Sequence, residues 1–341
     1  MTSENRFLNT GIVSIDPLVT YTKRHKPTPI GIAGSCPELF EGRSSLHFVG
    51  PVWNYEDHDV ADIAVHWRET AKALPDATFV FLNSTDRETL ALSAAGVPAI
   101  TCSELLFVDD TVFKPYAPAD FSGAAFDAIY VARLEPYKRH QLAREIENLA
   151  LMFDARFDQT QSAYDLEVTR LLPNARYLNF EKSAGQYVSL DPDARAQRMN
   201  QARCGLCLSK EEGAMRVSME YLMCGLPVVT TRSKGGRDRY FADPYVIVAE
   251  DDPANVARAV REIGRRKLSK LAIRDHIMRV VSFERRNFLS FANALVQKQF
   301  GVANLFSSLR PFIESWPFVE PEAAWSRARL KPFTEWLRPN A

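Results

Sequence analysis

Residues 212–229 read EGAMRVSMEYLMCGLPVV and hold two carboxylates, Glu212 and Glu220, with seven residues between them. Apolar residues at helical spacing predict a helix over 215–223. The Cys-Gly-Leu-Pro turn that follows leads into a β-branched run, which predicts a strand over 227–230. Carboxylates at two points along one helix suit a ligand rich in hydroxyl groups, because an ionised carboxylate accepts hydrogen bonds.

Short apolar runs alternate with longer helical patterns on both sides of this stretch, which predicts βα units and parallel sheets. In the second half of the chain we expect strands over 126–132, 175–180, 205–208, 227–230 and 245–248. We expect helices over 141–152, 192–201, 215–223 and 253–265, with a long amphipathic helix at about 280–299. This order is typical of a doubly wound α/β unit.

The first half of the chain predicts strands over 30–33, 46–49, 78–82 and 99–101, and helices at about 60–73 and 85–95. Ser84 or Thr85 can cap the second helix, with Glu88 placed for a capping box, and Gly96 stands in the C′ position of that helix. Two prolines without apolar periodicity indicate a linker over 114–120. We therefore predict an N-terminal domain, a second domain, and a C-terminal helix and tail that pack back on the first domain, over 1–120, 121–285 and 286–341.

The composition excludes several classes of protein. Lys and Arg number 42 and so do Asp and Glu, so the net charge of zero argues against a broad nucleic-acid surface. Residues 1–10 are polar, which predicts no signal peptide, and no apolar run reaches the length of a membrane span. The five cysteines are an odd number in mostly apolar surroundings, which favours free thiols in a reducing cytoplasm.

Two further sequence features, a pair of cysteines and a tryptophan-rich tail, give little indication of function. Cys204 and Cys207 have redox spacing, but they fall in an apolar strand and not at the start of a helix, so we predict buried thiols. The tail carries three tryptophans, Trp316, Trp325 and Trp336. We favour packing of this tail on the first domain over contact with a membrane surface or a partner.

Polar residues at the carboxyl ends of the predicted strands are the candidate ligand-binding groups. Arg133 and Lys138 follow the strand over 126–132. An arginine fork and a lysine point charge can hold a diphosphate and stabilise its departure without a metal. Two solvated surface cations are the alternative.

Glu212 lies near the end of the strand over 205–208, and eight residues at 1.5 Å place Glu220 roughly 12 Å further along the helix. One carboxylate can therefore bind sugar hydroxyls and the other ribose hydroxyls. We expect free N–H groups of Gly213 and Ala214 at the helix N-terminus to face a diphosphate. The alternative is a capping Glu212 with a solvated Glu220, although a carboxylate among apolar neighbours needs a partner.

Gly235 and Gly236 follow the strand over 227–230. Paired glycines at this point can present a concave run of N–H groups to an anion. An ordinary surface turn is the alternative.

Together these segments resemble retaining GT-B glycosyltransferases, in particular glycosyltransferase family 4. Arg133, Leu134 and Lys138 match the family's R-L-x(3)-K pattern, Glu212 and Glu220 match its E-x7-E pattern, and 224–229 match the turn and strand that follow. The resemblance covers about residues 80–270. It implies an α/β chain of GT-B architecture, in which two Rossmann-like doubly wound domains face each other across a cleft.

The resemblance also implies roles for these residues. In the family, the cations matching Arg133 and Lys138 bind the donor diphosphate. The first glutamate, here Glu212, contacts the donor hexose, and the second, here Glu220, contacts the ribose. A family histidine near the donor sugar makes His66 a candidate, although a structural histidine is the alternative. The chain departs from the family at Ala214 and Met215, where an aromatic and a small residue are usual.

The reaction implied is transfer of a hexose-type sugar from a UDP- or GDP-linked donor to a glycan or lipid-linked acceptor, with retention at the anomeric carbon. The first domain would bind the acceptor, and neither a cofactor nor a metal is expected. Since the charge is balanced and no polybasic segment is present, membrane contact would be at most peripheral, at the inner face. Contact with an assembly complex is a second possible partnership. The alternatives are a GT-B sugar-nucleotide epimerase or hydrolase, and a catalytically silent GT-B scaffold module.

Overall fold

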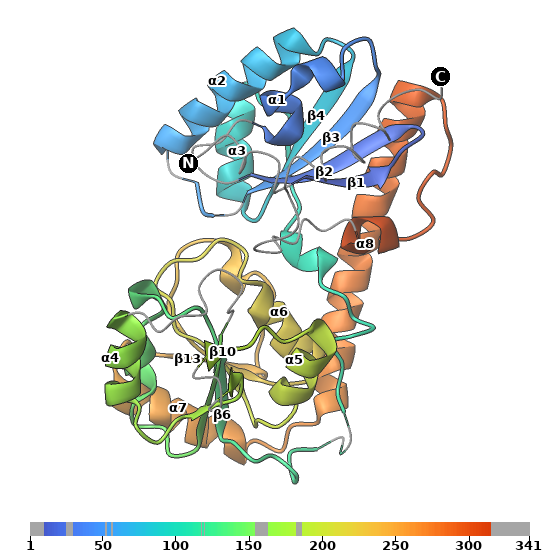
Figure 1. Cartoon of the computed structure of the whole chain (residues 1–341). Coiled ribbons are helices and arrows are strands. Elements are labelled where there is room, and N and C mark those ends of the chain that lie inside the picture. The colour runs from blue at the N-terminus through green and yellow to red at the C-terminus, as the bar shows by residue number, and fades with distance from the viewer. Residues whose placement is uncertain are drawn as a thin grey trace. The chain divides into compact units, whose positions relative to one another are not determined.

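The computed structural model describes residues 10–314 except 25–29, 52, 56, 117, 119, 154–162 and 182–185. The tryptophan-rich tail that we expect to pack on the first domain lies outside the described residues. The described chain divides into two units (Figure 1). Unit 1 comprises the residues up to Phe107 and those from Phe283 onward, and unit 2 runs from Val108 to Ser282.

Unit 2 is built on a parallel sheet of six strands, in the spatial order β13-β12-β11-β6-β7-β8. The strands are β6 (Ala128–Val131), β7 (Leu149–Met152), β8 (Arg176–Tyr177), β11 (Gly205–Cys207), β12 (Val228–Thr231) and β13 (Val246–Ala249). The chain moves outward from β6 to β8, then returns to the other side of β6 for the remaining strands. This is the order of a doubly wound Rossmann sheet, and its reversal point lies between β6 and β11.

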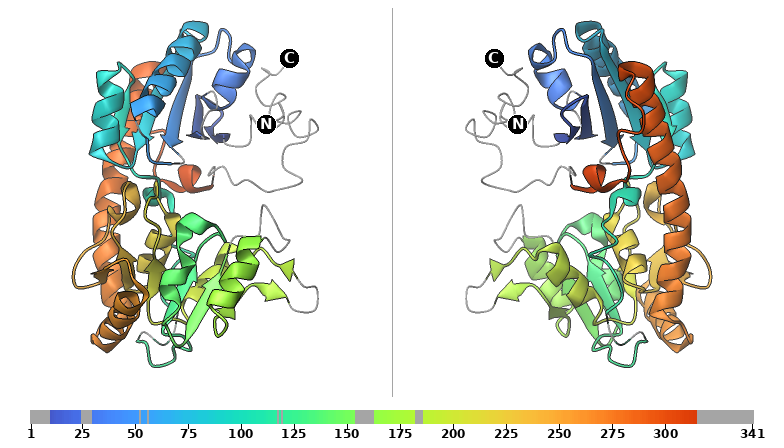
Figure 2. Two further views of the ribbon diagram at one scale, coloured as in Figure 1. Left: turned by 90° about the vertical axis from the view of Figure 1, so that its left-hand side faces the viewer. Right: turned by 90° about the vertical axis from the view of Figure 1, so that its right-hand side faces the viewer.

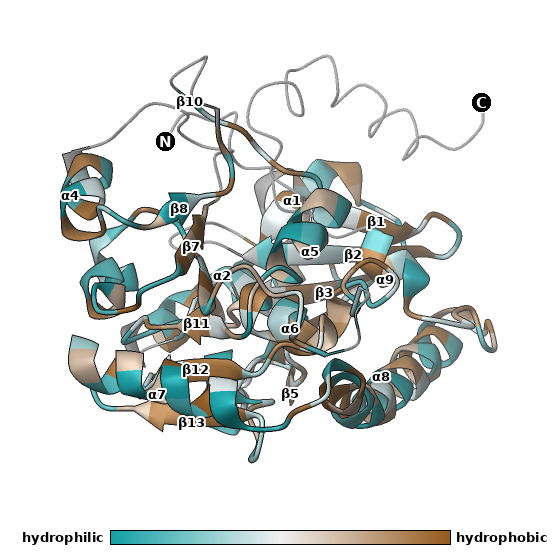
Figure 3. Cartoon of the chain, turned by 90° about the horizontal axis from the view of Figure 1, so that it is seen from below, coloured by the Kyte–Doolittle hydropathy of each residue, from teal (hydrophilic) through white to brown (hydrophobic). Residues whose placement is uncertain are grey.

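The helices of unit 2 are α4 (Ala163–Leu171), α5 (Pro192–Met199), α6 (Arg216–Met223), α7 (Pro253–Arg265) and the first part of α8 (Lys270–Phe300). A short antiparallel pair, β9 (Phe180–Glu181) with β10 (Gln186–Tyr187), lies outside the main sheet. The strands β11, β12 and β13 are hydrophobic, whereas α7 alternates between hydrophilic and hydrophobic residues (Figure 3). The apolar residues of α7 are buried, because only one face of this helix packs on the sheet.

The helix expected over 141–152 is wrong. His140–Ala143 form a 3-10 turn, and Leu149–Met152 form β7, which pairs with β6 over its whole length. All four residues of β7 are buried. A short apolar run with both faces covered carries no period, so its pattern does not separate a central strand from a helix.

Unit 1 has a five-stranded sheet whose strands follow the order of the sequence. They are β1 (Thr10–Ser14), β2 (Leu18–Arg24), β3 (Ser45–Pro51), β4 (Ala77–Asn83) and β5 (Ala99–Thr101). Only β1 runs antiparallel to its neighbour. Because the order does not reverse, the described part of this sheet has no reversal point.

Helices cover both faces of the unit 1 sheet. Helices α1 (Gly31–Ser35), α2 (Asp57–Ala73) and α3 (Asp86–Ala94) contribute to one apolar core with residues such as Val49 and Phe81. On the other face, Phe48 packs its ring against Phe288 of α8 and Phe312 of α9 (Arg310–Glu314), with ring centroids 5.5 and 5.6 Å away. Helix α8 is continuous from one unit to the next (Figure 2).

The strand expected over 30–33 is wrong, and β1, β2 and α4 were not predicted. Gly31 has a φ of 53° and opens the short helix α1, whose Ile32 N–H donates to the Thr10 hydroxyl at 3.3 Å. The apolar residues of this run are buried as a helical turn and not as a strand. The capping box of Thr85 and Glu88 on α3 is confirmed, and so is the left-handed Gly96, with a φ of 81°.

None of the helices in the described parts of residues 10–314 has the length and hydrophobicity of a membrane span.

We expect Gly225→Ala to lower the free energy of unfolding by more than about 2 kcal/mol. Gly225 ends α6 with a φ of 74°, and an added Cβ would lie 2.4 Å from the carbonyl oxygen of Lys270. The matched control is Gly264→Ala in α7, where the nearest atom to an added Cβ is 3.9 Å away. This control should be neutral or stabilise by about 0.5–1 kcal/mol. Chemical denaturation of both variants measures the difference, and equal effects would contradict the packing described.

Candidate functional site

The carboxyl ends of β6 and β11 are neighbours at the reversal point of the unit 2 sheet. The loop after β6 carries Lys138, in the 3-10 turn Pro136–Lys138, and the loop after β11 carries Glu212. The Lys138 ammonium forms an ion pair with Glu212 Oε1. Lys138 is 7% exposed and Glu212 is 5% exposed, so the pair is buried. Two predicted site residues, 74 positions apart in the sequence, are therefore in direct contact.

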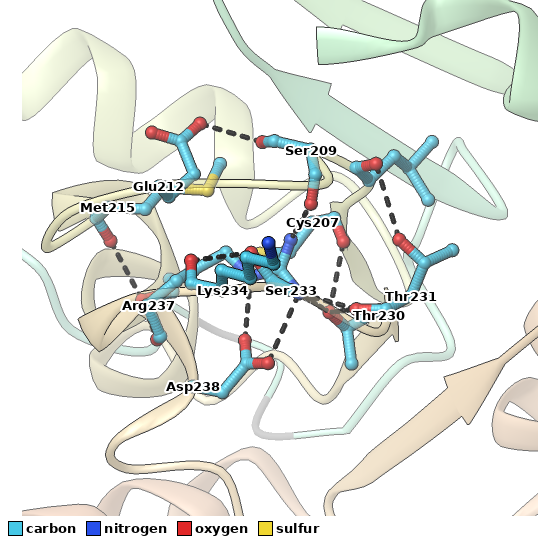
Figure 4. A network of polar contacts seen from close by, with 12 residues as sticks. Cys207, Ser209, Glu212, Met215, Thr230, Thr231, Ser233, Lys234, Arg237 and Asp238 are labelled. Atoms are coloured by element: carbon cyan, nitrogen blue, oxygen red, sulfur yellow. Dashed lines mark hydrogen bonds and ion pairs between the residues drawn. The ribbon is translucent and has the colours of Figure 1, made fainter. Parts of the chain in front are cut away.

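Further groups fix this pair. The Ser209 hydroxyl donates to Glu212 Oε1 at 2.7 Å (Figure 4), and the Glu212 N–H donates to the Lys234 carbonyl at 3.0 Å. The Lys138 ammonium lies 4.9 Å from the centroid of the Tyr137 ring. Burial, with a smaller contribution from the Glu212 carboxylate, raises the pKa of Tyr137 to about 12, so this phenol stays neutral at physiological pH.

Arg133 lies on the same loop as Lys138, but its side chain is exposed. The structure therefore separates the two predicted cations into one at the surface and one inside. The positive charge of Arg133 lowers the pKa of Tyr137, but the effect of burial is larger and raises it. The binding of a diphosphate by Arg133 stays a prediction.

Glu220 lies on α6 and is 1% exposed. The Arg195 guanidinium, from α5, donates to Glu220 Oε1 at 2.6 Å. The second carboxylate oxygen, Oε2, is buried and has no hydrogen-bond partner among the described residues. Arg195 was not predicted, because the pattern of α5 does not say which of its arginines faces another helix. A solvated Glu220 is excluded, since the carboxylate is buried against Arg195.

The helix expected over 215–223 is confirmed, since α6 begins at Arg216 with Met215 as its N-cap. The expected spacing of Glu212 and Glu220 along one helix axis is wrong, because Glu212, Gly213 and Ala214 precede the helix. The cause is backbone pairing beyond the strand ends, where the Lys234 N–H donates to the Lys210 carbonyl at 3.0 Å. This pairing keeps the chain extended for several residues after β11. Gly213 and Ala214 consequently do not supply N–H groups of the first helical turn.

Gly235 and Gly236 lie in the loop after β12, where Gly236–Asp238 form a 3-10 turn. Gly235 has a φ of 95° and a ψ of −165°, a combination that is open almost only to glycine. Anion binding by this loop stays a prediction. The loop also carries Arg237, a fully buried side chain that was not predicted.

His66 lies on α2 of unit 1. Its Nε2 is 3.1 Å from Asp62 Oδ1, one helical turn earlier, and its Nδ1 is 3.9 Å from Glu69 Oε2. The side chain is partly exposed on the helix surface. Its role near a donor sugar stays a prediction.

The residues described within 10–314 contain no group of three or more His, Cys, Asp or Glu side chains arranged for a metal ion. Metal independence stays a prediction.

The buried-thiol interpretation of Cys204 and Cys207 is confirmed, because both are free and fully buried. Burial raises the pKa of Cys207 to about 12 and also raises the pKa of Cys204 strongly. Since the thiolate is the reactive form, neither thiol is suited to redox chemistry in the folded protein.

We expect no more than one thiol of the native protein to react with a disulfide reagent. Four of the five cysteines are buried, and Cys36 is partly exposed. In denaturant all five should react, which provides the control. Absorbance titration of the released thiolate measures both numbers, and fast reaction of two or more native thiols would contradict the burial described.

No protein-family model matches the sequence, and no curated protein matches it. Solved structures match its fold. A glycosyltransferase from Rickettsia africae ESF-5 has a TM-score of 0.54 at 11% identity, covering 82% of this chain and 77% of that chain. A sucrose-phosphate synthase from Thermosynechococcus elongatus has a TM-score of 0.51 at 14% identity, with coverages of 81% and 74%.

An alpha,alpha-trehalose 6-phosphate synthase from Burkholderia multivorans gives a TM-score of 0.50 at 12% identity, covering 82% of this chain and 72% of that chain. The chain has the GT-B fold. The expected α/β class with Rossmann-like sheets is thereby confirmed. At identities this low the likeness establishes the GT-B fold alone.

Proposed function

We propose that this GT-B chain is a retaining, metal-independent glycosyltransferase of the family 4 type. It transfers a hexose-type sugar from a UDP- or GDP-linked donor to a hydroxyl of a glycan or lipid-linked acceptor. The observation that carries the proposal is the buried Lys138–Glu212 pair at the reversal point of the unit 2 sheet. Open α/β sheets bind ligands at this point. The names of the solved structures with this fold, two of them sugar-phosphate synthases, agree with a sugar transferase.

Lys138 supplies the charge that such a reaction needs. The departing nucleoside diphosphate gains negative charge in the transition state, and a positioned cation stabilises that charge most effectively where water is excluded. Lys138 is buried and its partner Glu212 holds it in place, so little reorganisation is needed when the donor binds. Arg133, exposed on the same loop, adds a second cation that can reach the diphosphate from solvent.

The two glutamates suit different parts of the donor. Glu212 accepts hydrogen bonds from Lys138 and Ser209 through Oε1, and we assign its other oxygen to hydroxyls of the donor sugar. Glu220 Oε2 is buried without a partner among the described residues, which costs free energy until a donor group reaches it. A ribose hydroxyl can donate to this oxygen, so we assign Glu220 to the nucleoside. The acceptor proton would pass to the departing phosphate.

Thermal-shift measurements with UDP-, GDP-, ADP- and CMP-linked sugars would identify the donor, since a ligand of the native state raises the melting temperature. The stabilising donor is then incubated with a panel of glycan and lipid-linked acceptors, with and without EDTA. We expect a glycoside with the anomeric configuration of the donor, formed at the same rate in EDTA. Turnover of the donor without an acceptor would favour an epimerase or hydrolase. Binding without turnover would favour a scaffold, and binding of none of the donors would contradict the proposal.

A further inference from the structure

Arg237 is a fully buried arginine in the loop over 233–238, which follows β12. Its guanidinium donates to the Ser209 carbonyl at 2.6 Å, to the Thr230 hydroxyl at 2.7 Å and to the Thr231 carbonyl at 2.5 Å (Figure 4). It also pairs with the Asp238 carboxylate at 2.6 Å. One side chain therefore connects the carboxyl ends of β11 and β12.

Burial of the Arg237 guanidinium costs free energy, so stability alone does not account for an arginine at this position. A buried charge loses its hydration, and replacement of a buried ion pair by apolar side chains of similar volume is often neutral or stabilising. The acid that pairs with Arg237 is its neighbour Asp238, whose side chain is 37% exposed. The guanidinium differs from an apolar side chain in one respect, because its fixed N–H directions set the positions of the groups that it contacts.

The group that Arg237 fixes next to the site is Ser209. Arg237 binds the backbone carbonyl of Ser209, and the Ser209 hydroxyl donates to Glu212 Oε1 at 2.7 Å. The backbone of Lys234, in the same loop, bonds to Lys210 and Glu212, each at 3.0 Å. The loop over 233–238 thus holds both ends of the segment 209–212.

The same loop also touches α6, which carries Glu220. The Ser218 hydroxyl, in the first turn of α6, lies 2.8 Å from the Met215 carbonyl and 3.3 Å from the backbone carbonyl of Arg237, so its proton is shared between these two acceptors. The contact with Arg237 uses the backbone and persists when the side chain of Arg237 is replaced. A change of that side chain should therefore act on Ser209 and Glu212 and not on Glu220.

We propose that Arg237 is a positioning residue, which fixes the Glu212 carboxylate through Ser209 and thereby sets the rate of sugar transfer without setting the affinity for the nucleotide. The inference rests on the function proposed above, in which Glu212 contacts the donor sugar and Glu220 the ribose.

The test compares wild type with Arg237→Lys, which keeps the charge and loses the fork. We expect kcat to fall at least about tenfold while the Kd of the nucleoside diphosphate stays within about twofold. Hydrogen exchange of the peptide covering 209–212 should become at least about tenfold faster, with exchange in β6 unchanged. The exchange measurement needs no turnover, so it tests the positioning whether or not the donor is identified.

A double-mutant cycle with Ser209→Ala separates positioning from general loosening. If Arg237 acts on Glu212 through Ser209, the second substitution removes little that the first has not already removed. Ser209→Ala should then lower kcat by about tenfold in wild type and by less than about threefold in the Arg237→Lys protein. The control cycle pairs Ser209→Ala with Arg139→Lys. Arg139 also joins the two strand ends, through the Leu208 carbonyl and the Thr231 hydroxyl at 2.6 Å each, and its hydrogen bonds among the described residues do not include the Ser209 carbonyl or hydroxyl. Its effect should be additive with that of Ser209→Ala.

The role of Arg237 would be overturned if the Arg237→Lys variant kept the kcat and the hydrogen exchange of wild type. It would also be overturned if the effects of Arg237→Lys and Ser209→Ala on kcat were additive. An equal loss in kcat and nucleotide affinity would overturn it as well. Absence of transfer by wild type itself is a different result: it removes the proposed function, while unchanged exchange over 209–212 would still refute the positioning. The two failures are thereby distinguishable.

Discussion

Replacement of Lys138 by methionine should lower kcat for sugar transfer at least about 100-fold and destabilise the fold by about 3–5 kcal/mol. The activity falls because the departing diphosphate loses its buried cation. The stability falls because Glu212, 5% exposed, keeps a buried charge without its partner. Transfer assays and chemical denaturation measure the two effects on the same protein.

The double variant Lys138→Met/Glu212→Gln distinguishes these effects. It removes both charges, so most of the lost stability should return while transfer stays absent. Lys210→Met is the control, because Lys210 is exposed and its contact with Lys234 uses the backbone. It should change stability by less than about 0.5 kcal/mol and leave transfer unchanged. Full transfer by Lys138→Met, or a double variant no more stable than the single one, would contradict the buried pair.

Glu220→Gln should weaken the binding of the nucleoside diphosphate by about 10- to 100-fold, as expected for loss of a charge-assisted hydrogen bond. The reason is that Glu220 Oε2 is the buried acceptor assigned to the ribose. Calorimetric titration with the nucleoside diphosphate and with its 2′,3′-dideoxy analogue measures the contribution of the hydroxyls. Wild type should prefer the natural ribose, and Glu220→Gln should lose that preference.

Glu262→Gln provides the control for this prediction. Glu262 lies on α7 in the same unit, and its side chain is 56% exposed in an ion pair with Arg266. Its replacement should leave both affinities unchanged. If Glu220→Gln weakens the natural and the dideoxy nucleotide equally, the carboxylate acts through the structure of α6 and not through the ribose.

Local signals were sufficient for most elements of unit 2. Helix α7 has the predicted bounds, Pro253–Arg265, because Asp252 caps it, proline stands at its first position and one face is apolar. The strand Leu149–Met152 was predicted as part of a helix, because a fully buried strand has no polar face to reveal its period. The short helix Gly31–Ser35 was predicted as a strand, because its few apolar residues could equally belong to either element.

Some contacts of the candidate site could likewise be predicted from the sequence, and others could not. Contact between Lys138 and Glu212 follows from the doubly wound order, which makes the strands before them neighbours. Arg195 and Arg237 could not be predicted, because each meets a partner from a distant segment and an arginine in a loop or helix reads as a surface residue. The start of α6 was predicted to within one residue, because the apolar spacing begins at Met215. The pairing of Lys234 with residues beyond β11 was not predicted, because it is also long-range.

In the proposed function Glu212, paired with Lys138, contacts the transferred sugar. The most direct test is single-turnover transfer from the stabilising donor by wild type and by Glu212→Gln, with nucleoside diphosphate binding measured on both. We predict nucleotide affinity within about threefold of wild type and transfer at least about 100-fold slower in the variant. Product formation by Glu212→Gln at the wild-type rate would contradict this role of Glu212.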